Sequence, residues 1–163
     1  MILANRDYVR SVLFGIEDSL VSTTGLIAGV SVGGASKEVV ILSGIVAIAI
    51  EAVSMGAGEY LSDDALQELD KIKRHKERPF VSGFLMLTSY LLAGLVPLTP
   101  VIFLSYPASV YCSAVSALVG LFLLGYIKGK ILKTNRLRGA LKILIVGGVA
   151  TLLGVAVGLI FKV

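Results

Sequence analysis

Charged residues are scarce in this sequence, and cysteine and histidine each occur once. Only 16% of the 163 residues are charged, whereas 56% are hydrophobic. A water-soluble chain of this size covers its surface with polar groups, so the composition excludes a soluble domain. Cys112 alone cannot form an intrachain disulfide, a cysteine zinc site or an iron–sulfur cluster, and His75 alone does not make a histidine-rich zinc carrier. The composition is typical of a polytopic membrane protein.

Five apolar runs are long enough to cross a membrane, since a spanning helix needs about 20 mostly apolar residues. They lie near residues 11–34, 39–61, 80–104, 107–127 and 140–161. The sequence therefore predicts an all-α fold in which residues 1–163 form a single five-helix transmembrane domain. Pro97 and Pro100 are expected to kink or end the third span, which leaves its boundary with the fourth span the least defined.

Basic residues gather on one side of the predicted membrane. Thirteen Lys and Arg residues fall on the side of the N-terminus, and only Lys37 and Lys162 fall on the other side. By the positive-inside rule, the N-terminus and both long loops are cytoplasmic, and five crossings leave the C-terminus outside. Compact loops favour the cell membrane of a prokaryote, although a vacuolar membrane fits the same topology. Membrane lipids explain the net charge of +4, so no nucleic acid partner is expected.

Four acidic residues lie inside the first two spans, namely Glu17, Asp18, Glu51 and Glu59. An acid at the centre of a membrane helix costs about 2.5 to 3.5 kcal/mol, so four of them would cost on the order of 10 kcal/mol if they faced lipid. They must face protein, water or an ion. One hypothesis is a structural network that holds the helices together, in which these acids pair with the hydroxyl groups of Ser22, Thr23, Thr24, Ser54 or Tyr60. The other hypothesis is a path for a cation.

Helical spacing places an acid and a glycine pair on one stripe of the first span. Asp18, Ser22, Gly25 and Gly29 follow the spacing i, i+4, i+7 and i+11, which is a stripe within about 40°. A GxxxG pair lets two helices approach closely, so Asp18 is expected to point into a helix–helix contact. A second copy of the chain is one partner for that contact, which predicts a homodimer. Glu17, Ser22, Gly25 and Gly29 are therefore candidates for the lining of a transport path.

The second span carries two carboxylates and a thioether on one side. Glu51, Met55 and Glu59 follow the spacing i, i+4 and i+8, and the helical rise places Met55 and Asp18 at the same depth, each about 12 Å from the cytoplasmic side. Carboxylate, hydroxyl and thioether ligands suit a borderline divalent ion such as Fe²⁺ better than magnesium or calcium. A divalent cation displaces protons from protonated carboxyls, so proton exchange is expected. An apolar filler role is the alternative for Met55.

The strings EDSLVSTTGLIAGVSVGG (17–34) and EAVSMGAGEYLSDDA (51–65) resemble the signature segments of the vacuolar iron transporter family, which includes nodulin-21-like relatives. The resemblance implies a homodimer of five-helix subunits. Such a dimer would move Fe²⁺, or manganese, out of the cytoplasm in exchange for protons through a path at the dimer interface. The resemblance also implies translocation roles for Asp18, Met55 and Glu59, whereas Glu51 is assigned to the metal path by its helix face.

The chain departs from the better-known members of that family between the second and third spans. Those members carry a long cytoplasmic metal-binding domain there, and this chain has only residues 62–79. Asp63 and Asp64 are expected to continue the second helix, and together with Glu68 they form an acidic group at the cytoplasmic mouth. The basic stretch 71–78 is expected to anchor the topology.

The sequence thus predicts a divalent metal transporter with no permanently bound cofactor. The alternative is a non-transporting membrane interaction protein whose acids are structural. An enzyme is not expected, because the spans contain no histidine and no Ser/His arrangement for hydrolysis.

Overall fold

Five α-helices make up the part of the chain that the computed structural model describes, residues 6–69, 78–131 and 133–162. They are α1 (Arg6–Val32), α2 (Lys37–Leu69), α3 (Pro79–Phe103), α4 (Ala108–Ile131) and α5 (Arg136–Ile160). These ranges contain no strand. All five helices are long and apolar enough to cross a membrane. The prediction of an all-α chain with five membrane-spanning helices is confirmed, and the chain is an integral membrane protein.

α2 is longer than a bilayer requires. Its 33 residues correspond to about 50 Å of helix, against about 30 Å of hydrocarbon. The helix continues without a break through Asp63 and Asp64 to Leu69, as predicted. The basic stretch 71–78 lies outside the described residues except for Arg78.

α3 contains both prolines of the third span and ends only at Phe103. The expectation that Pro97 or Pro100 could end this helix is therefore wrong. Pro100 has no N–H, so it leaves the carbonyl group of Val96 without its usual partner in the helix. The hydroxyl group of Ser116 in α4 donates to that carbonyl at 3.5 Å. The same hydroxyl group lies 2.8 Å from the carbonyl of Ser113 in its own helix, so its single proton replaces the missing backbone hydrogen bond only in part.

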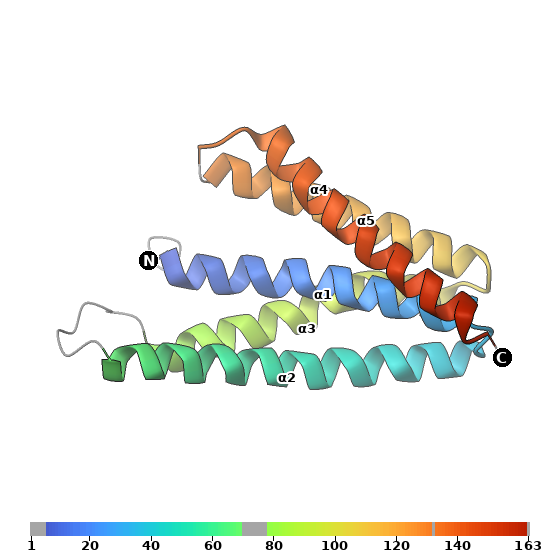
Figure 1. Ribbon diagram of the computed structural model, residues 1–163, viewed down its shortest axis with the longest axis horizontal. Coiled ribbons are helices and arrows are strands. Elements are labelled where there is room, and N and C mark those ends of the chain that lie inside the picture. The colour runs from blue at the N-terminus through green and yellow to red at the C-terminus, as the bar shows by residue number, and fades with distance from the viewer. Residues whose placement is uncertain (1–5, 70–77, 132, 163) are drawn as a thin grey trace.

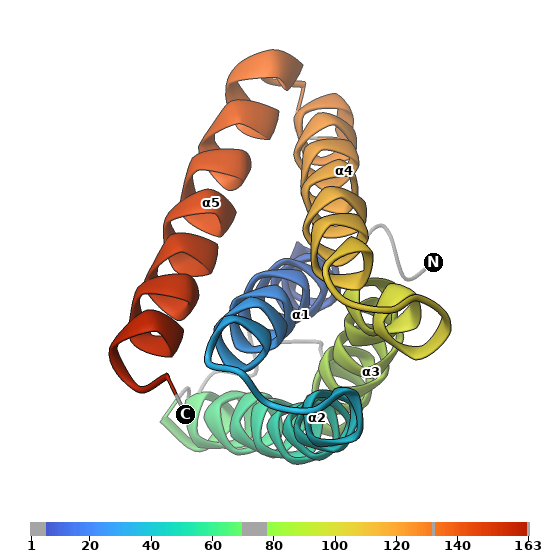
Figure 2. The same cartoon turned by 90° about the vertical axis from the view of Figure 1, so that its right-hand side faces the viewer.

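α1 is the central helix of the bundle, because it contacts each of the other four helices. α2 and α3 pack on one side of α1, and the α4–α5 hairpin packs on the other (Figures 1 and 2). The hairpin diverges from α1 toward the end of the bundle that holds the N-terminus, while α5 meets α1 at the opposite end (Figure 1). Two buried apolar clusters join the helices: Ile27, Val40, Ile48, Leu98 and Val101 in one, and Leu20, Ala93, Leu121 and Ile143 in the other.

Two glycine pairs bring α1 and α5 into backbone contact. A Cβ atom added to Gly29 would lie 2.6 Å from the carbonyl oxygen of Gly154. One added to Gly154 or Gly158 would collide with the carbonyl oxygen of Gly25 or Gly29. The GxxxG pair of the first span therefore does form a close helix–helix contact. Its partner is α5 of the same chain, because Gly154 and Gly158 supply a second GxxxG surface that fits it.

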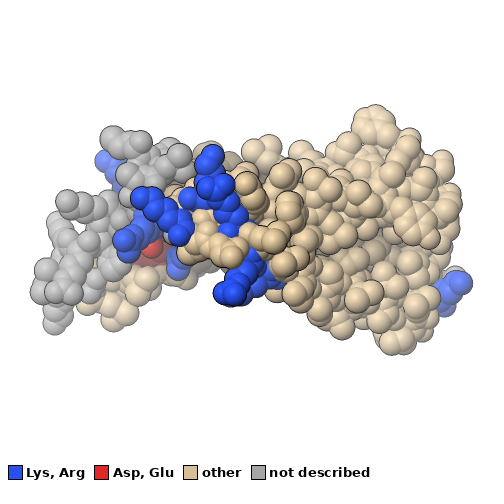
Figure 3. All heavy atoms as spheres, turned by 90° about the horizontal axis from the view of Figure 1, so that it is seen from above, with Lys and Arg blue, Asp and Glu red and all other residues tan. Residues whose placement is uncertain are grey.

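Basic side chains gather at one end of the bundle, which we call the basic end. Figure 3 shows them over one part of the molecule, with further blue atoms at the far tip. The alternating helix directions bring together the start of α1, the start of α3 and the turn between α4 and α5. The basic residues there are Arg6, Arg10, Arg78, Lys128, Lys130, Lys133, Arg136 and Arg138.

Candidate metal path

Glu51 lies in a triangle of side-chain oxygens supplied by three helices. The hydroxyl group of Ser22 in α1 donates to Oε2 of Glu51 at 3.0 Å. The hydroxyl group of Tyr90 in α3 donates to the same oxygen, and the Ser22 and Tyr90 hydroxyl oxygens lie 2.6 Å apart. Tyr90 is fully buried, and Ser19 donates to its backbone carbonyl at 2.7 Å. These contacts fix the Glu51 carboxylate between α1 and α3.

Asp18 lies one helical turn before Ser22 and is half-buried. Its carboxylate is close enough to Glu51 and Glu17 for their negative charges to repel it. Within the described residues, no group donates a hydrogen bond to the carboxylate of Asp18 or forms an ion pair with it. In the described part of the chain, Asp18 is therefore a carboxylate with acidic neighbours and no compensating group.

Glu59 lies nearer the basic end, where α1 supplies its partners. Ser11 donates to Oε1 of Glu59 at 2.6 Å, and the Arg10 guanidinium lies 2.9 Å from the same oxygen. Arg10 is also 3.9 Å from Oδ1 of Asp63. The second oxygen of Asp63 is buried and has no hydrogen-bond partner among the described residues. Two carboxylates of α2 thus share one guanidinium group, whose single positive charge offsets only one of their two negative charges.

Met55 lies midway along α2 between these two sites and is half-buried. Glu51 is level with Ser22 and Glu59 is level with Ser11, so Met55 is level with the part of α1 around Asp18. This agrees with the equal depths that the sequence predicts for Met55 and Asp18.

The remaining acids of the candidate path are Glu17 in the middle of α1 and two residues near the end of α2. Glu17 lies 3.7 Å from Lys128 of α4. Asp64 is half-buried and Glu68 is exposed, and both lie farther along α2, beyond Asp63. Of the acidic group that we predicted at the mouth, only Asp63 has a contact with the Arg10 guanidinium.

The predicted ladder of acids divides into two groups within one copy of the chain. Asp18 and Glu51 form one group, and Glu59 and Asp63 form the other. In the described part of the chain, no three His, Cys, Asp or Glu side chains lie close enough together to hold a metal ion. A complete metal site would therefore need further ligands, such as a thioether, a backbone carbonyl, water or a second copy of the chain.

Sequence reasoning missed four of the partners that hold these acids: Tyr90, Arg10, Ser11 and Lys128. Tyr90 carried a detectable signal, since a phenol inside an apolar span needs a hydrogen-bond partner. Arg10 and Lys128 were interpreted only as topology markers. Their pairing with acids joins residues 49 and 111 positions apart, and one-dimensional spacing does not reveal such contacts.

Comparison with known proteins identifies the family. The model of the VIT family matches residues 9–79 and 63–159. The chain belongs to the VIT family. This VIT-family chain is 25% identical over 206 residues to vacuolar iron transporter 1 of Eucalyptus grandis, which covers 89% of the chain and 83% of that protein. Vacuolar iron transporter 1 of Arabidopsis thaliana is likewise 25% identical, with 89% of the chain and 82% of the relative covered.

The relatives also differ in length from this VIT-family chain. The Eucalyptus alignment extends over 206 positions, which exceeds the 163 residues of the chain, so that relative contains segments that the chain lacks. Vacuolar iron transporter homolog 2 of Arabidopsis thaliana is 26% identical over only 154 residues, with 88% of the chain and 79% of the relative covered. The resemblance found in the sequence is confirmed, and the chain is a short member.

Proposed function

We propose that this VIT-family protein transports a divalent metal ion, with Fe²⁺ as the first candidate and Mn²⁺ as the second. The observation that carries the proposal is Asp18, a carboxylate within an apolar helix that has no partner among the described residues and lies beside Glu51 and Glu17. Such an arrangement is unfavourable in a membrane unless a cation visits it. The names of the relatives, vacuolar iron transporters, support iron as the cargo.

The path that we propose enters at the basic end and proceeds from Asp63 and Glu59 past Met55 to Asp18 and Glu51. Each of the two glutamates is held through one oxygen, and the other oxygen accepts no hydrogen bond from a described residue. A carboxylate held in this way is oriented and still has a lone pair for a metal. Oxygen ligands with one thioether suit Fe²⁺.

Proton exchange is supported by the hydrogen bonds of the Glu51 triangle. Three oxygen–oxygen contacts join Glu51, Ser22 and Tyr90. Ser22 and Tyr90 bring only two hydroxyl protons, and both donate to Glu51, so the Ser22–Tyr90 contact lacks a proton. A proton on Glu51 that is donated to Ser22 would let Ser22 donate to Tyr90, and all three contacts would then be hydrogen bonds. A metal ion that binds Glu51 would displace this proton. When the metal ion leaves, a proton could bind Glu51 again.

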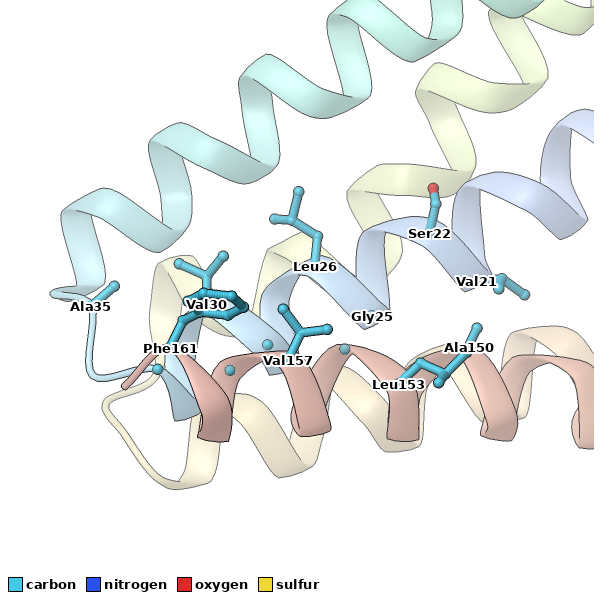
Figure 4. A pocket seen from close by; sticks show the side chains of 14 residues that line it. Val21, Ser22, Gly25, Leu26, Val30, Ala35, Ala150, Leu153, Val157 and Phe161 are labelled. Atoms are coloured by element: carbon cyan, nitrogen blue, oxygen red, sulfur yellow. The ribbon is translucent and has the colours of Figure 1, made fainter. Parts of the chain in front are cut away.

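A second copy of the chain would complete the site in this proposal. A groove of about 610 Å³ follows α1 and α5, and its lining is apolar except for Ser22 (Figure 4). Asp18 lies one turn from Ser22 on α1, so a partner subunit that packs along α1 could place its own Asp18 nearby. The interface between two subunits would then supply the carboxylates that one copy lacks.

We also propose that the basic end is cytoplasmic, because the described Lys and Arg residues are concentrated there. The ion would then move out of the cytoplasm. The cell membrane of a prokaryote remains our expectation from the compact loops, although the names of the relatives refer to a vacuole.

One observation favours a second candidate function. Glu51 and Glu59 each accept two hydrogen bonds from neighbouring helices. A non-transporting membrane interaction protein could use the same bonds to hold its helices together. Neither candidate assigns enzymatic chemistry to the chain.

Metal flux into proteoliposomes distinguishes the two candidates. Uptake of Fe²⁺ under an imposed pH gradient is measured by quenching of a trapped dye. We expect Asp18→Ala to abolish uptake and Met55→Ala to weaken it, because both ligands lie on the proposed path. Glu38→Gln, which changes an exposed acid at the opposite end of α2, is the matched control and should leave uptake unchanged. Uptake that survives in Asp18→Ala contradicts the path, and absence of uptake in the folded wild-type protein favours the second candidate.

A further inference from the structure

A cavity of about 500 Å³ lies at the basic end beside α1 and α4. Its lining joins residues of α1 to Lys128 of α4, and the α4–α5 hairpin diverges from α1 toward this end of the bundle (Figure 1). Its lining combines two kinds of surface. Three basic residues, Arg6, Arg10 and Lys128, contribute to it, and so does an apolar wall of Val9, Leu13, Phe14 and Met86.

The cations in this cavity outnumber the acids. Glu17 and Glu59 are the acids of the lining. Lys128 lies 3.7 Å from Glu17, and Arg10 lies 2.9 Å from Glu59. Arg6 is exposed and forms no ion pair with a described residue. Among the described residues, the cavity therefore has one cation without an ion-pair partner. Lys128 is held by one carboxylate, and Arg10 is held by Glu59 with a longer contact to Asp63.

In the Lys128–Glu17 and Arg10–Glu59 ion pairs, another anion could replace the carboxylate as the partner of the cation. The side chain of Arg10 is 60% exposed, and that of Lys128 is 39% exposed. Ion pairs with so much solvent contact are weak. An anion with several oxygens can engage more than one of these cations and form stronger, bidentate hydrogen bonds with an arginine.

The apolar wall identifies the kind of anion. Phe14 is 49% exposed, and Val9 and Leu13 are partly exposed on the same helix. These residues lie in the first turns of α1. The apolar run predicted for the first span begins near residue 11, so we expect this wall to lie where headgroups give way to acyl chains. A basic rim above an apolar wall between transmembrane helices fits a lipid headgroup with its chain.

We propose that this cavity binds an anionic phospholipid, with the phosphate group on Arg6, Arg10 and Lys128 and an acyl chain along Val9, Leu13 and Phe14. The phosphate would draw Arg10 away from Glu59 and Lys128 away from Glu17. Both carboxylates would then be free to meet a cation at the entrance of the path. This second effect rests on the proposed function, whereas the lipid site itself does not.

Lipid binding to the purified full-length protein tests the site. Native mass spectrometry in detergent compares phosphatidylglycerol with phosphatidylcholine of the same acyl chains. We expect the wild type to retain phosphatidylglycerol more tightly, and Arg6→Gln and Lys128→Gln each to weaken that binding about fivefold, as expected for one cation near a lipid phosphate. Lys130→Gln, two residues along α4 and outside the cavity lining, is the matched control and should bind like the wild type.

Three results overturn the lipid site. The first is equal retention of the two lipids, and the second is an equal loss in Lys130→Gln and Lys128→Gln. The third is displacement of phosphatidylglycerol by millimolar inorganic phosphate, which would identify a site for free phosphate instead. Lys128→Arg keeps the charge and should restore binding, which separates loss of the site from loss of folding.

Metal flux in two membranes tests the effect on the path. We expect added phosphatidylglycerol to raise Fe²⁺ uptake over pure phosphatidylcholine in the wild type and in Lys130→Gln, and to raise it less in Arg6→Gln. An anionic membrane also raises the Fe²⁺ concentration at its surface, but by the same factor for every variant. This general effect therefore cancels when the uptake ratios of the variants are compared. Lost lipid binding with an unchanged flux ratio overturns the effect on the path but not metal transport. Retained lipid binding with no flux in either membrane overturns the proposed function but not the lipid site.

Discussion

The two halves of α1 hold their neighbours by different chemistry. The first half, from Arg6 to Ser22, contacts α2 and α3 through hydroxyl groups, a guanidinium group and carboxylates. The second half, from Gly25 to Val32, contacts α5 through bare backbone. Burial of apolar side chains gives little advantage inside a lipid bilayer, so close packing and hydrogen bonds must hold the helices together. The comparison indicates that the glycine half of α1 holds α1 and α5 together by close packing. The polar half carries carboxylates that close packing of helices does not require.

The largest expected effect lies in the glycine half. A Cβ atom on Gly158 would collide with the backbone carbonyl of Gly29, and backbone cannot move aside as the tip of a side chain can. We expect Gly158→Ala to destabilise the protein by about 1 to 3 kcal/mol, the usual cost of overpacking. Thermal unfolding in detergent measures the loss.

The same helix offers the control for this prediction. Gly148 has nothing within 4 Å of an added Cβ atom, and alanine favours a helix by about 1 kcal/mol over glycine. Gly148→Ala should therefore keep or slightly raise the melting temperature. An equal loss in Gly148→Ala and Gly158→Ala would contradict the α1–α5 contact.

A smaller effect is expected where the polar half meets α3. Tyr90→Phe keeps the buried ring but removes the hydroxyl group that donates to Glu51. Loss of one such hydrogen bond, with a carboxylate left partly unsatisfied, should cost about 1 to 2 kcal/mol. Thermal unfolding checks the stability, and Fe²⁺ uptake should fall because the carboxylate is no longer fixed.

Two further variants separate the role of Tyr90 in transport from a role in folding. Tyr106→Phe changes an exposed phenol and should leave both measurements unchanged. Glu51→Gln can keep the triangle, since the amide donates where a carboxyl proton would, but it cannot exchange a proton. This variant should keep its stability and lose the response of uptake to the pH gradient. A full response to pH in Glu51→Gln would show that the proton travels elsewhere.

The smallest effect on stability is expected at Arg10, whose side chain is 60% exposed. Arg10→Gln removes an exposed partner, so the cost should stay below about 1 kcal/mol. Glu59 and Asp63 would lose their shared cation, and binding of Mn²⁺ as a paramagnetic probe should become tighter. Electron paramagnetic resonance measures the free Mn²⁺. Arg138→Gln, another exposed arginine of the basic end, is the control, and equal affinities in the two variants would contradict the role assigned to Arg10.

The five helices were predictable from the sequence because the bilayer imposes a minimum length on each apolar run. The end of α3 was not, since the helix continues past both prolines to Phe103, and the surroundings that tolerate them, such as Ser116 of α4 near the freed carbonyl of Val96, belong to another helix. Gly25 and Gly29 do lie in a close helix–helix contact, as their spacing predicts, whereas the contact expected for Asp18 stays a prediction. The partner helix was not predictable, because the spacing on α1 does not show that α5 lies opposite; α5 crosses α1 obliquely and meets it in backbone contact at the glycine end (Figure 1).

The candidate acids were also predictable, since the cost of charge in lipid marks them wherever they occur. Their partners were not, because helix periodicity identifies a face but not the residue that lies opposite to it. Tyr90 and Lys128 come from α3 and α4, and only the three-dimensional packing brings them to Glu51 and Glu17.

Anomalous scattering from crystals soaked with Co²⁺ or Fe²⁺ tests the central claim most directly. If the membrane carboxylates of α1 and α2 serve a passing metal ion, an element-specific peak should lie between Asp18 and Met55, and it should vanish in Asp18→Ala. A peak at a different place, or none while Glu51 keeps its bonds to Ser22 and Tyr90, would contradict the account.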